Sequence, residues 1–236
     1  MKTYGQFCPV AKAAELLDER WTLLVLRELF AGSTHFNELR RGVPRMSPSL
    51  LSKRLKALVR AGVLDRFEDG DTVVYRLTPA GEELKPLIEA LGAWGVRWIG
   101  ELGDADYDPH LLLWDMHRRV DVQALPPGRT VIHFRFASLP ADTRDWWLVL
   151  APEGVVDVCD FDPGFGDDLV MESDLPTLVH VWRGDIDWSE ALRSGAVRLQ
   201  GPASLRRALP RWFQLSVFAA VARPQVGQAT LDPSPS

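Results

Sequence analysis

The pattern of apolar and polar positions between residues 47 and 61 predicts a helix with two contrasting faces. Ser47 is a suitable N-cap, and Pro48 suits the first helical position, where a missing backbone N–H has no cost. Gly62 supplies a natural end to the helix. The predicted buried stripe consists of Leu51, Leu55, Leu58 and Val59. The opposite side carries Ser49, Ser52, Lys53, Lys56 and Arg60.

Apolar spacing predicts three short helices ahead of this one. They cover residues 10–18, 20–31 and 34–42. Short helices that lead into a capped, basic helix are the parts of a helix-turn-helix, in which the last helix lies in the major groove of DNA.

Two β-rich runs within residues 63–78 are joined at Asp69-Gly70. This pair is a strong hairpin signal, because both central residues of a type I′ turn need positive φ. A hairpin directly after the basic helix is a wing, and one long helix is expected to follow from Thr78. The apolar residues of that helix, at alternating spacings of three and four, are Leu84, Leu87, Leu91, Trp94 and Trp98. Such a stripe is too apolar to leave in water and predicts a dimer.

The second half of the chain alternates strand-like and helical patterns, which indicates an α+β domain with a mostly antiparallel sheet. The expected strands cover residues 130–136, 146–150, 155–161, 169–172 and 196–200. The expected helices are 109–120, one capped by Asp174 and ending at Arg183, one capped by Asp187 and ending at Arg193, and a closing helix over 202–221.

Charge is distributed unevenly along the chain. Residues 1–100 carry 15 Lys+Arg against 12 Asp+Glu and residues 101–236 carry 12 against 20, so the two parts have charges of +3 and −8, which sum to −5. Between Leu39 and Leu64 there are seven cationic side chains and no carboxylate. Because the field that attracts a polyanion is local, the net negative charge does not argue against DNA binding.

Several classes of protein are disfavoured. Two cysteines, Cys8 and Cys159, are too few for a disulfide framework or a metal site. No apolar run approaches the about 20 residues that a membrane span needs, and the N-terminus lacks the apolar segment of a signal peptide, so a cytoplasmic protein is expected. Motifs for nucleophilic, nucleotide or zinc chemistry are absent, and the acidic cluster within 160–168 lacks EF-hand spacing. We therefore expect no enzyme, cofactor or metal.

Residues 7 to about 100 resemble the HxlR-type winged helix-turn-helix regulators. The resemblance is carried by several motifs in the right order, namely Phe7-Cys8-Pro9-Val10, Arg20 to Leu29, Phe36 to Leu39, Ser47 to Leu55 and Tyr75 to Gly81. It covers less than half of the chain and implies a homodimeric transcription factor that binds a double-stranded DNA operator, here expected to be a repressor.

The expected DNA-binding residues are Arg45, Ser47, Ser49, Ser52, Lys53, Lys56, Arg60, Arg66 and Arg76. Ser49, Ser52 and Lys53 would approach base edges, whereas Arg45, Lys56 and Arg60 suit phosphates. Arg66 and Arg76 flank the wing. The wing could equally be structural, because carboxylates at its tip would repel DNA. Some HxlR-type regulators resemble this chain in having an N-terminal cysteine that senses oxidants or electrophiles. Cys8 is therefore a redox candidate, with simple packing in the dimer region as the alternative.

The order of elements in the second half is similar to the sterol carrier protein fold, which holds apolar ligands between sheet and helices. The candidate ligand-binding residues are Phe134, Phe136, Trp146, Phe161, Trp182 and Trp212. His133 and Arg135 alternate with apolar neighbours and so face the opposite way. Ordinary core packing is the alternative for each aromatic residue, and a protein-interaction module is the alternative for the domain.

The sequence therefore predicts a multidomain α and α+β protein. The expected organisation is a winged helix-turn-helix DNA-binding and dimerisation domain over 1–100, a linker over 101–108, an α+β sterol-carrier-like domain over 109–222 and a disordered tail over 223–236. Operator binding is expected to respond to an apolar small molecule in the second domain. The alternatives are redox sensing through Cys8 and, least favoured, an enzyme with an appended DNA-binding domain.

Overall fold

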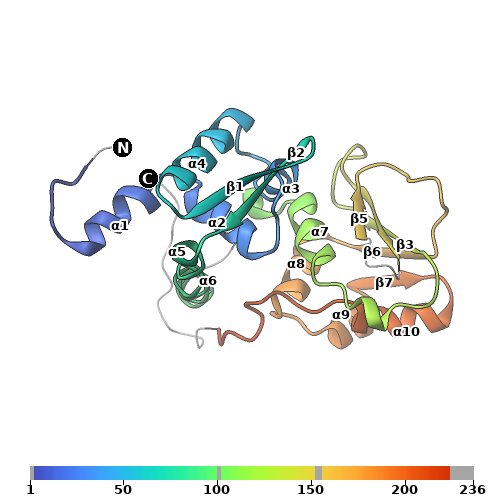
Figure 1. The fold of residues 1–236 in the computed structure, drawn as a ribbon. Helices are drawn as coiled ribbons and strands as arrows, with labels where there is room; N and C mark the ends of the chain where they lie inside the picture. The colour runs from blue at the N-terminus through green and yellow to red at the C-terminus, as the bar shows by residue number, and fades with distance from the viewer. Residues whose placement is uncertain (1–2, 100–101, 152–155, 224–236) are drawn as a thin grey trace. The chain divides into compact units, whose positions relative to one another are not determined.

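A computed structural model describes residues 3–99, 102–151 and 156–223. The chain divides into two compact units, Met1–Gly95 (unit 1) and Val96–Ser236 (unit 2) (Figure 1). The expected linker starts outside the described residues and includes a short 3-10 turn at Asp104–Asp106. The expected disordered tail, apart from Arg223, also lies outside them.

Unit 1 is a cluster of helices around one apolar core. Its first four helices are α1 (Pro9–Leu17), α2 (Thr22–Phe30), α3 (Phe36–Gly42) and α4 (Pro48–Arg60). The predicted stripe of α4 is confirmed, because Leu51, Leu55 and Leu58 are at most 1% exposed and Val59 packs at the edge of the core. The stripe meets the core residues of α2 and α3, Val25, Leu26, Leu29 and Leu39.

A buried guanidinium fixes α4 to the turn between α1 and α2. Arg54 donates from Nε to the backbone carbonyl of Arg20 at 3.1 Å and pairs through Nη2 with Glu19 at 2.5 Å. The same turn holds Trp21 at φ 79°, a left-handed conformation that is strained for a residue with a side chain. Arg54 belongs to the basic segment of the sequence, but it is buried and therefore serves the fold.

The wing is an antiparallel hairpin of β1 (Leu64–Asp69) and β2 (Thr72–Leu77). Asp69 pairs with Thr72, so the central turn residues are Gly70 and Asp71, and only Gly70 has positive φ, at 59°. The prediction of a type I′ turn centred on Asp69-Gly70 is therefore wrong. Glycine at the first central position is the pattern of a type II′ turn, which needs positive φ only there.

Two helices, α5 (Pro79–Glu82) and α6 (Lys85–Trp98), replace the single long helix expected from Thr78. Thr78 caps α5 by accepting from the N–H of Gly81 at 3.1 Å. Pro86 is the second residue of α6. It has no backbone N–H to continue the hydrogen-bond ladder from α5, which explains the interruption.

Unit 2 is built on a five-stranded sheet of order β5-β4-β3-β6-β7. The strands are β3 (Thr130–Phe136), β4 (Asp145–Leu150), β5 (Val156–Cys159), β6 (Leu169–Ser173) and β7 (Val197–Gln200). Every neighbouring pair is antiparallel except β3 and β6, which are parallel. The sheet is thus mixed but mostly antiparallel, as the pattern predicted.

The helices of unit 2 are α7 (Pro109–His117), α8 (Leu175–Arg183), α9 (Trp188–Ser194) and α10 (Ala203–Trp212), with a 3-10 turn at Val122–Ala124. They bury the apolar face of the sheet in one core that includes Leu113, Phe134, Val181 and Trp212. The expected closing helix over 202–221 is too long. It ends at Trp212, because Phe213 is extended and bridges to Val120, and the N–H of Gln214 donates to the carbonyl of Arg119.

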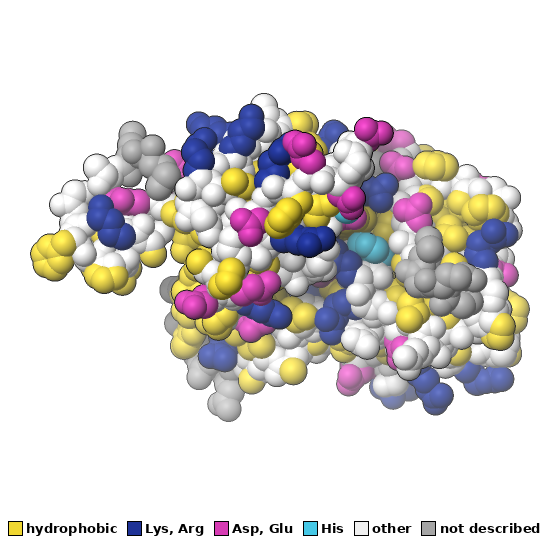
Figure 2. Space-filling view, in the orientation of Figure 1, with side chains coloured by type: hydrophobic (Ala, Val, Ile, Leu, Met, Phe, Trp, Pro, Cys, Tyr) yellow, Lys and Arg dark blue, Asp and Glu magenta, His cyan; other side chains and the backbone are white. Residues whose placement is uncertain are grey.

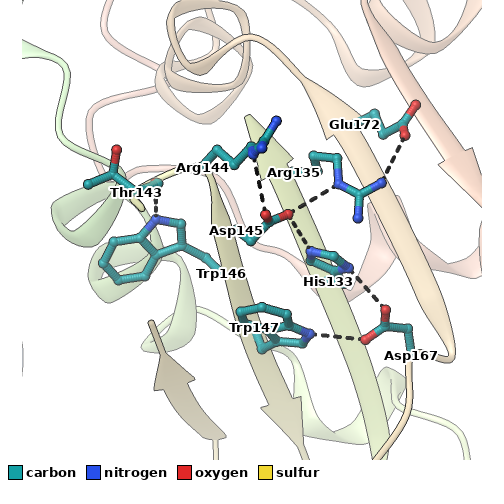
Figure 3. Close-up of polar contacts among 9 residues, drawn as sticks. All are labelled: His133, Arg135, Thr143, Arg144, Asp145, Trp146, Trp147, Asp167 and Glu172. Carbon is teal, nitrogen blue, oxygen red and sulfur yellow. Dashed lines mark hydrogen bonds and ion pairs between the residues drawn. The ribbon is translucent and has the colours of Figure 1, made fainter. Parts of the chain in front are cut away.

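The other face of the sheet carries a polar cluster centred on His133 (Figure 3). His133 Nε2 lies 2.8 Å from Asp145 and Nδ1 lies 3.0 Å from Asp167. Its ring stacks on Trp147 with centroids 4.5 Å apart, and Arg135 donates to Asp145 at 3.1 Å. Each ring nitrogen of His133 thus lies within hydrogen-bond distance of a carboxylate, although the residue is only 4% exposed.

Asp145 makes this cluster sensitive to pH. Burial opposes the charge on Asp145, but hydrogen bonds from His133 and Arg135 hold the pKa of its carboxyl below the usual value. A carboxyl whose pKa is lower in the folded than in the unfolded chain stabilises the folded state at pH values above its ordinary pKa of about 4. This stabilisation is lost as the pH falls through the pKa of the folded state.

We expect Asp145→Asn to lower the free energy of unfolding by about 1–3 kcal/mol near neutral pH, because the amide loses the charged hydrogen bonds. The difference from the unsubstituted chain should narrow when the pH falls below about 4. Urea unfolding at several pH values checks this, with the exposed Asp142→Asn as the matched control. A difference that stays constant with pH would contradict it.

Candidate DNA-binding surface

The start of α4 is fixed by its cap. Ser47 accepts from the N–H of Leu50 at 3.3 Å, and Pro48 occupies the first position of the helix. The Ser47 hydroxyl also lies 3.2 Å from that of Ser49. Ser47 was expected among the DNA-binding residues, and the structure shows a capping role for its oxygen.

The outward face of α4 is cationic. Ser49, Lys53, Lys56 and Arg60 are exposed and Ser52 is half-buried. Figure 2 shows dark blue side chains gathered over α4 at the top of the view. Within the described residues, no ion pair is found for Lys53, Lys56 or Arg60. Their positive charge therefore faces solvent without a compensating carboxylate, as a surface that attracts phosphates requires.

The turn between α3 and α4 carries Arg45 beside this face. Arg45 is exposed, while its neighbours Val43 and Met46 are only 2% exposed and anchor the turn in the core. A cation on an anchored turn next to the helix N-terminus is well placed to contact a phosphate.

The two wing arginines interact with their own hairpin. Arg66 pairs with Glu68 at 3.0 Å, and this contact raises the pKa of the Arg66 guanidinium. The Arg76 guanidinium lies over the ring of Phe67, 5.2 Å from its centroid. The tip itself is acidic and consists of Glu68, Asp69, Gly70 and Asp71. The wing therefore presents less free positive charge than α4.

The expected dimerisation stripe divides into two parts. Leu84 packs against the core of unit 1. Leu87, Leu91, Trp94 and Trp98, which we call the α6 seam, are exposed by 52%, 48%, 45% and 39%. Four large apolar side chains on one face of a single helix form a patch of the kind that a partner usually covers.

Cys8 stands at the N-cap of α1 and is half-buried, and its backbone carbonyl accepts from the N–H of Lys12 at 3.1 Å. Cys159 is buried at the end of β5. The redox role of Cys8 stays a prediction.

The six candidate ligand-binding aromatics do not line one pocket. Phe134, Phe136, Trp146, Trp182 and Trp212 are at most 8% exposed and belong to the packed core, whereas Phe161 is 66% exposed. Trp182 donates to Asp115 at 3.1 Å.

Unit 2 instead has a surface groove of about 610 Å³ that the sequence analysis missed. Its local signal was available, because residues 193–211 contain five arginines and no carboxylate. Among the residues that the structure describes, no cluster of metal-binding side chains is found, and no helix is long and apolar enough to span a membrane.

Comparison with known proteins places unit 1 in a family. The family model described as HxlR-like helix-turn-helix matches residues 16–102. The HTH-type transcriptional regulator Rv3095 of Mycobacterium tuberculosis (strain H37Rv) is 44% identical over 95 residues, and this match covers 38% of this chain but only 58% of that relative.

A Bacillus subtilis relative is matched over most of its length. The HTH-type transcriptional regulator YvaP (strain 168) is 36% identical over 99 residues, which are 40% of this chain and 92% of YvaP. The solved structure of the reduced form of the transcriptional regulator YodB from B. subtilis is 30% identical, covers 38% of this chain and 92% of that one, and superposes with a TM-score of 0.34. From the match to nearly the whole of YvaP, together with the family model over the helices and wing of unit 1, we conclude that this chain belongs to the HxlR-like helix-turn-helix family.

Proposed function

We propose that this chain is a DNA-binding transcriptional regulator whose helix α4 lies in the major groove. The observation that carries the proposal is the exposed, uncompensated cationic face of α4, opposite a leucine stripe that is almost fully buried. The family membership of unit 1 supports it.

The side chains of α4 and its flanking turn have different roles in this proposal. Ser49, Ser52 and Lys53 lie toward the start of the helix, the part that reads base edges in helix-turn-helix proteins. Arg45, Lys56 and Arg60 contact phosphates and add affinity that depends on salt but not on sequence. Arg66 and Arg76 contribute less, because each already has a partner in the wing.

The α6 seam supports a homodimer. Burying it against a second copy would remove four large apolar side chains from water, and a two-fold axis would present two copies of α4 to DNA. The half-sites of the operator should then be centred about one helical turn, ~10 bp, or a multiple of it apart.

Regulation by unit 2 also belongs to this proposal, with repression as the expected output. An apolar ligand would have to separate the aromatic residues that now form the packed core, since five of the six candidates are buried there. A protein-interaction role for unit 2 needs no such opening, and a specific surface supports it below.

We expect Lys53→Ala to weaken binding to a site selected by this protein from random duplex DNA by about 1–3 kcal/mol, because a base contact is lost. Lys56→Ala is the matched variant on the same face. It should weaken specific and non-specific binding alike and reduce the slope of log K against log salt by about one. Fluorescence anisotropy over a series of salt concentrations measures both.

The assignment of α4 fails if neither variant changes affinity for the selected site. It also fails if Lys53→Ala has the same effect on selected and random DNA, because Lys53 would then carry no sequence information.

We expect Leu91→Asp to convert the homodimer into a monomer, because a carboxylate would be buried in the α6 seam. Sedimentation velocity measures the mass, and DNA affinity should fall at least about tenfold with the loss of the second half-site. Lys85→Asp, at the start of the same helix and outside the seam, is the control. A Leu91→Asp chain that sediments like the unsubstituted one would contradict the dimer.

We expect an apolar effector, if unit 2 binds one, to raise the thermal unfolding temperature by preferential binding to the folded state. A thermal-shift screen with apolar metabolites makes the measurement, and Phe134→Ala serves to locate any hit in the core. No shift with any compound, or a shift that Phe134→Ala leaves unchanged, would remove the aromatic core as the effector site.

A further inference from the structure

A groove runs between strand β7 and helix α10 of unit 2 and has a volume of about 610 Å³, within the range of about 300–1,000 Å³ that is usual for binding sites. The helical side is formed by Ala203, Arg206, Arg207 and Pro210. Their spacing places them on one face of α10. Leu192 of α9 and the residues of β7 complete the lining. The groove thus lies between a strand and a single helical face, and Figure 1 shows β7 and α10 side by side.

The groove follows the open edge of the sheet. All four residues of β7, Val197 to Gln200, line it, although consecutive side chains of a strand point to opposite faces. Lining by residues that point to both faces favours a groove along the outer side of β7. Within the described residues β7 pairs only with β6. Backbone N–H and C=O groups on the other side of the strand are therefore available to an added strand.

The chemistry of the groove combines an apolar floor with a cationic rim. Leu192 and Leu199, which are half-buried, contribute the apolar part together with Val197, which is only 1% exposed and belongs to the core. Arg206 and Arg207 are exposed, and no ion pair is found for either within the described residues. Arg198 lies 3.5 Å from Glu172, but its side chain is still 67% exposed.

This positive charge is exceptional in its part of the chain. Residues 101–236 have 12 Lys+Arg against 20 Asp+Glu, a balance of −8, yet residues 193–211 contain five arginines and no carboxylate. Figure 2 shows dark blue side chains along the lower edge of unit 2, near β7 and α10. A local cationic field on an acidic domain favours an anionic partner.

We propose that the β7 groove binds an extended acidic segment of a partner protein, which adds a strand to β7 and places its carboxylates against Arg206 and Arg207. Main-chain hydrogen bonds to β7 supply affinity, while alternate side chains enter the apolar floor and supply specificity. A small amphipathic anion would use the same arginines, but it would leave the free edge of the strand unused. The proposal concerns unit 2 alone and does not depend on DNA binding by α4.

The test uses the full chain and a fluorescein-labelled peptide, Glu-Val-Glu-Leu-Glu-Val, with anisotropy as the readout. We expect saturable binding that the double variant Arg206→Glu, Arg207→Glu weakens at least about tenfold. Arg211→Glu lies on the same helix but outside the groove and should change the affinity by less than about twofold. Circular dichroism confirms that each variant is folded.

Two comparisons identify the binding mode. A peptide N-methylated at alternate backbone nitrogens cannot pair as a strand on its methylated edge and should lose binding. The amides of β7 should gain protection from hydrogen exchange when the unmodified peptide is bound. A chain with Lys53→Ala and Lys56→Ala must bind the peptide as well as the unsubstituted chain does, which separates the groove from the basic face of α4.

Several results would overturn the proposal. Binding that survives N-methylation would show that no strand is added. Binding that depends on Lys53 and Lys56, or that ignores the change at Arg206 and Arg207, would place the peptide elsewhere. Saturable binding of laurate in the groove without binding of the peptide would identify a small-anion site instead.

Discussion

Burial of the leucine stripe of α4 is the constraint on which unit 1 depends. Leu51, Leu55 and Leu58 are almost completely buried, and each such side chain contributes about 1.5–3 kcal/mol when it leaves water. The positions on opposite sides of a helix are fixed relative to one another, so packing this stripe turns Lys53 and Lys56 toward solvent. The core and the outward cationic face are therefore two results of one packing arrangement.

In unit 2, burial fixes the two faces of strand β3 in the same way, but with a period of two residues. Ile132, Phe134 and Phe136 enter the core, and the residues between them reach the other face. His133 is nevertheless buried there, because Trp147 stacks on its ring and two aspartates face its nitrogens. Both faces of the strand are thus ordered, one by apolar packing and the other by ring stacking and side-chain hydrogen bonds.

Local signals were enough to predict α4, the hairpin and most strands of unit 2, since caps, alternation and turn residues act over a few positions. The helix limits that were predicted wrongly depend on backbone hydrogen bonds, which the pattern of apolar and polar residues does not show. Pro86 interrupts the expected long helix, and the extended Phe213 ends the closing one. Arg54 was counted only among the seven cationic side chains between Leu39 and Leu64, and its buried pairing could not be predicted because its partner, Glu19, lies 35 positions away in sequence. The positive charge of the β7 groove could be read from residues 193–211, but its position beside the last strand of the sheet needed the strand order, which no single segment contains.

The anchoring of Arg54 has a mechanical consequence. Because Arg54 is held by Glu19 and by the carbonyl of Arg20, the orientation of α4 is tied to a turn 34 and 35 positions earlier in the chain. That turn includes Trp21 in a left-handed conformation, which costs free energy for a residue with a side chain. The direction in which the cationic face of α4 points therefore depends on the backbone of the α1–α2 turn as well as on the leucine stripe.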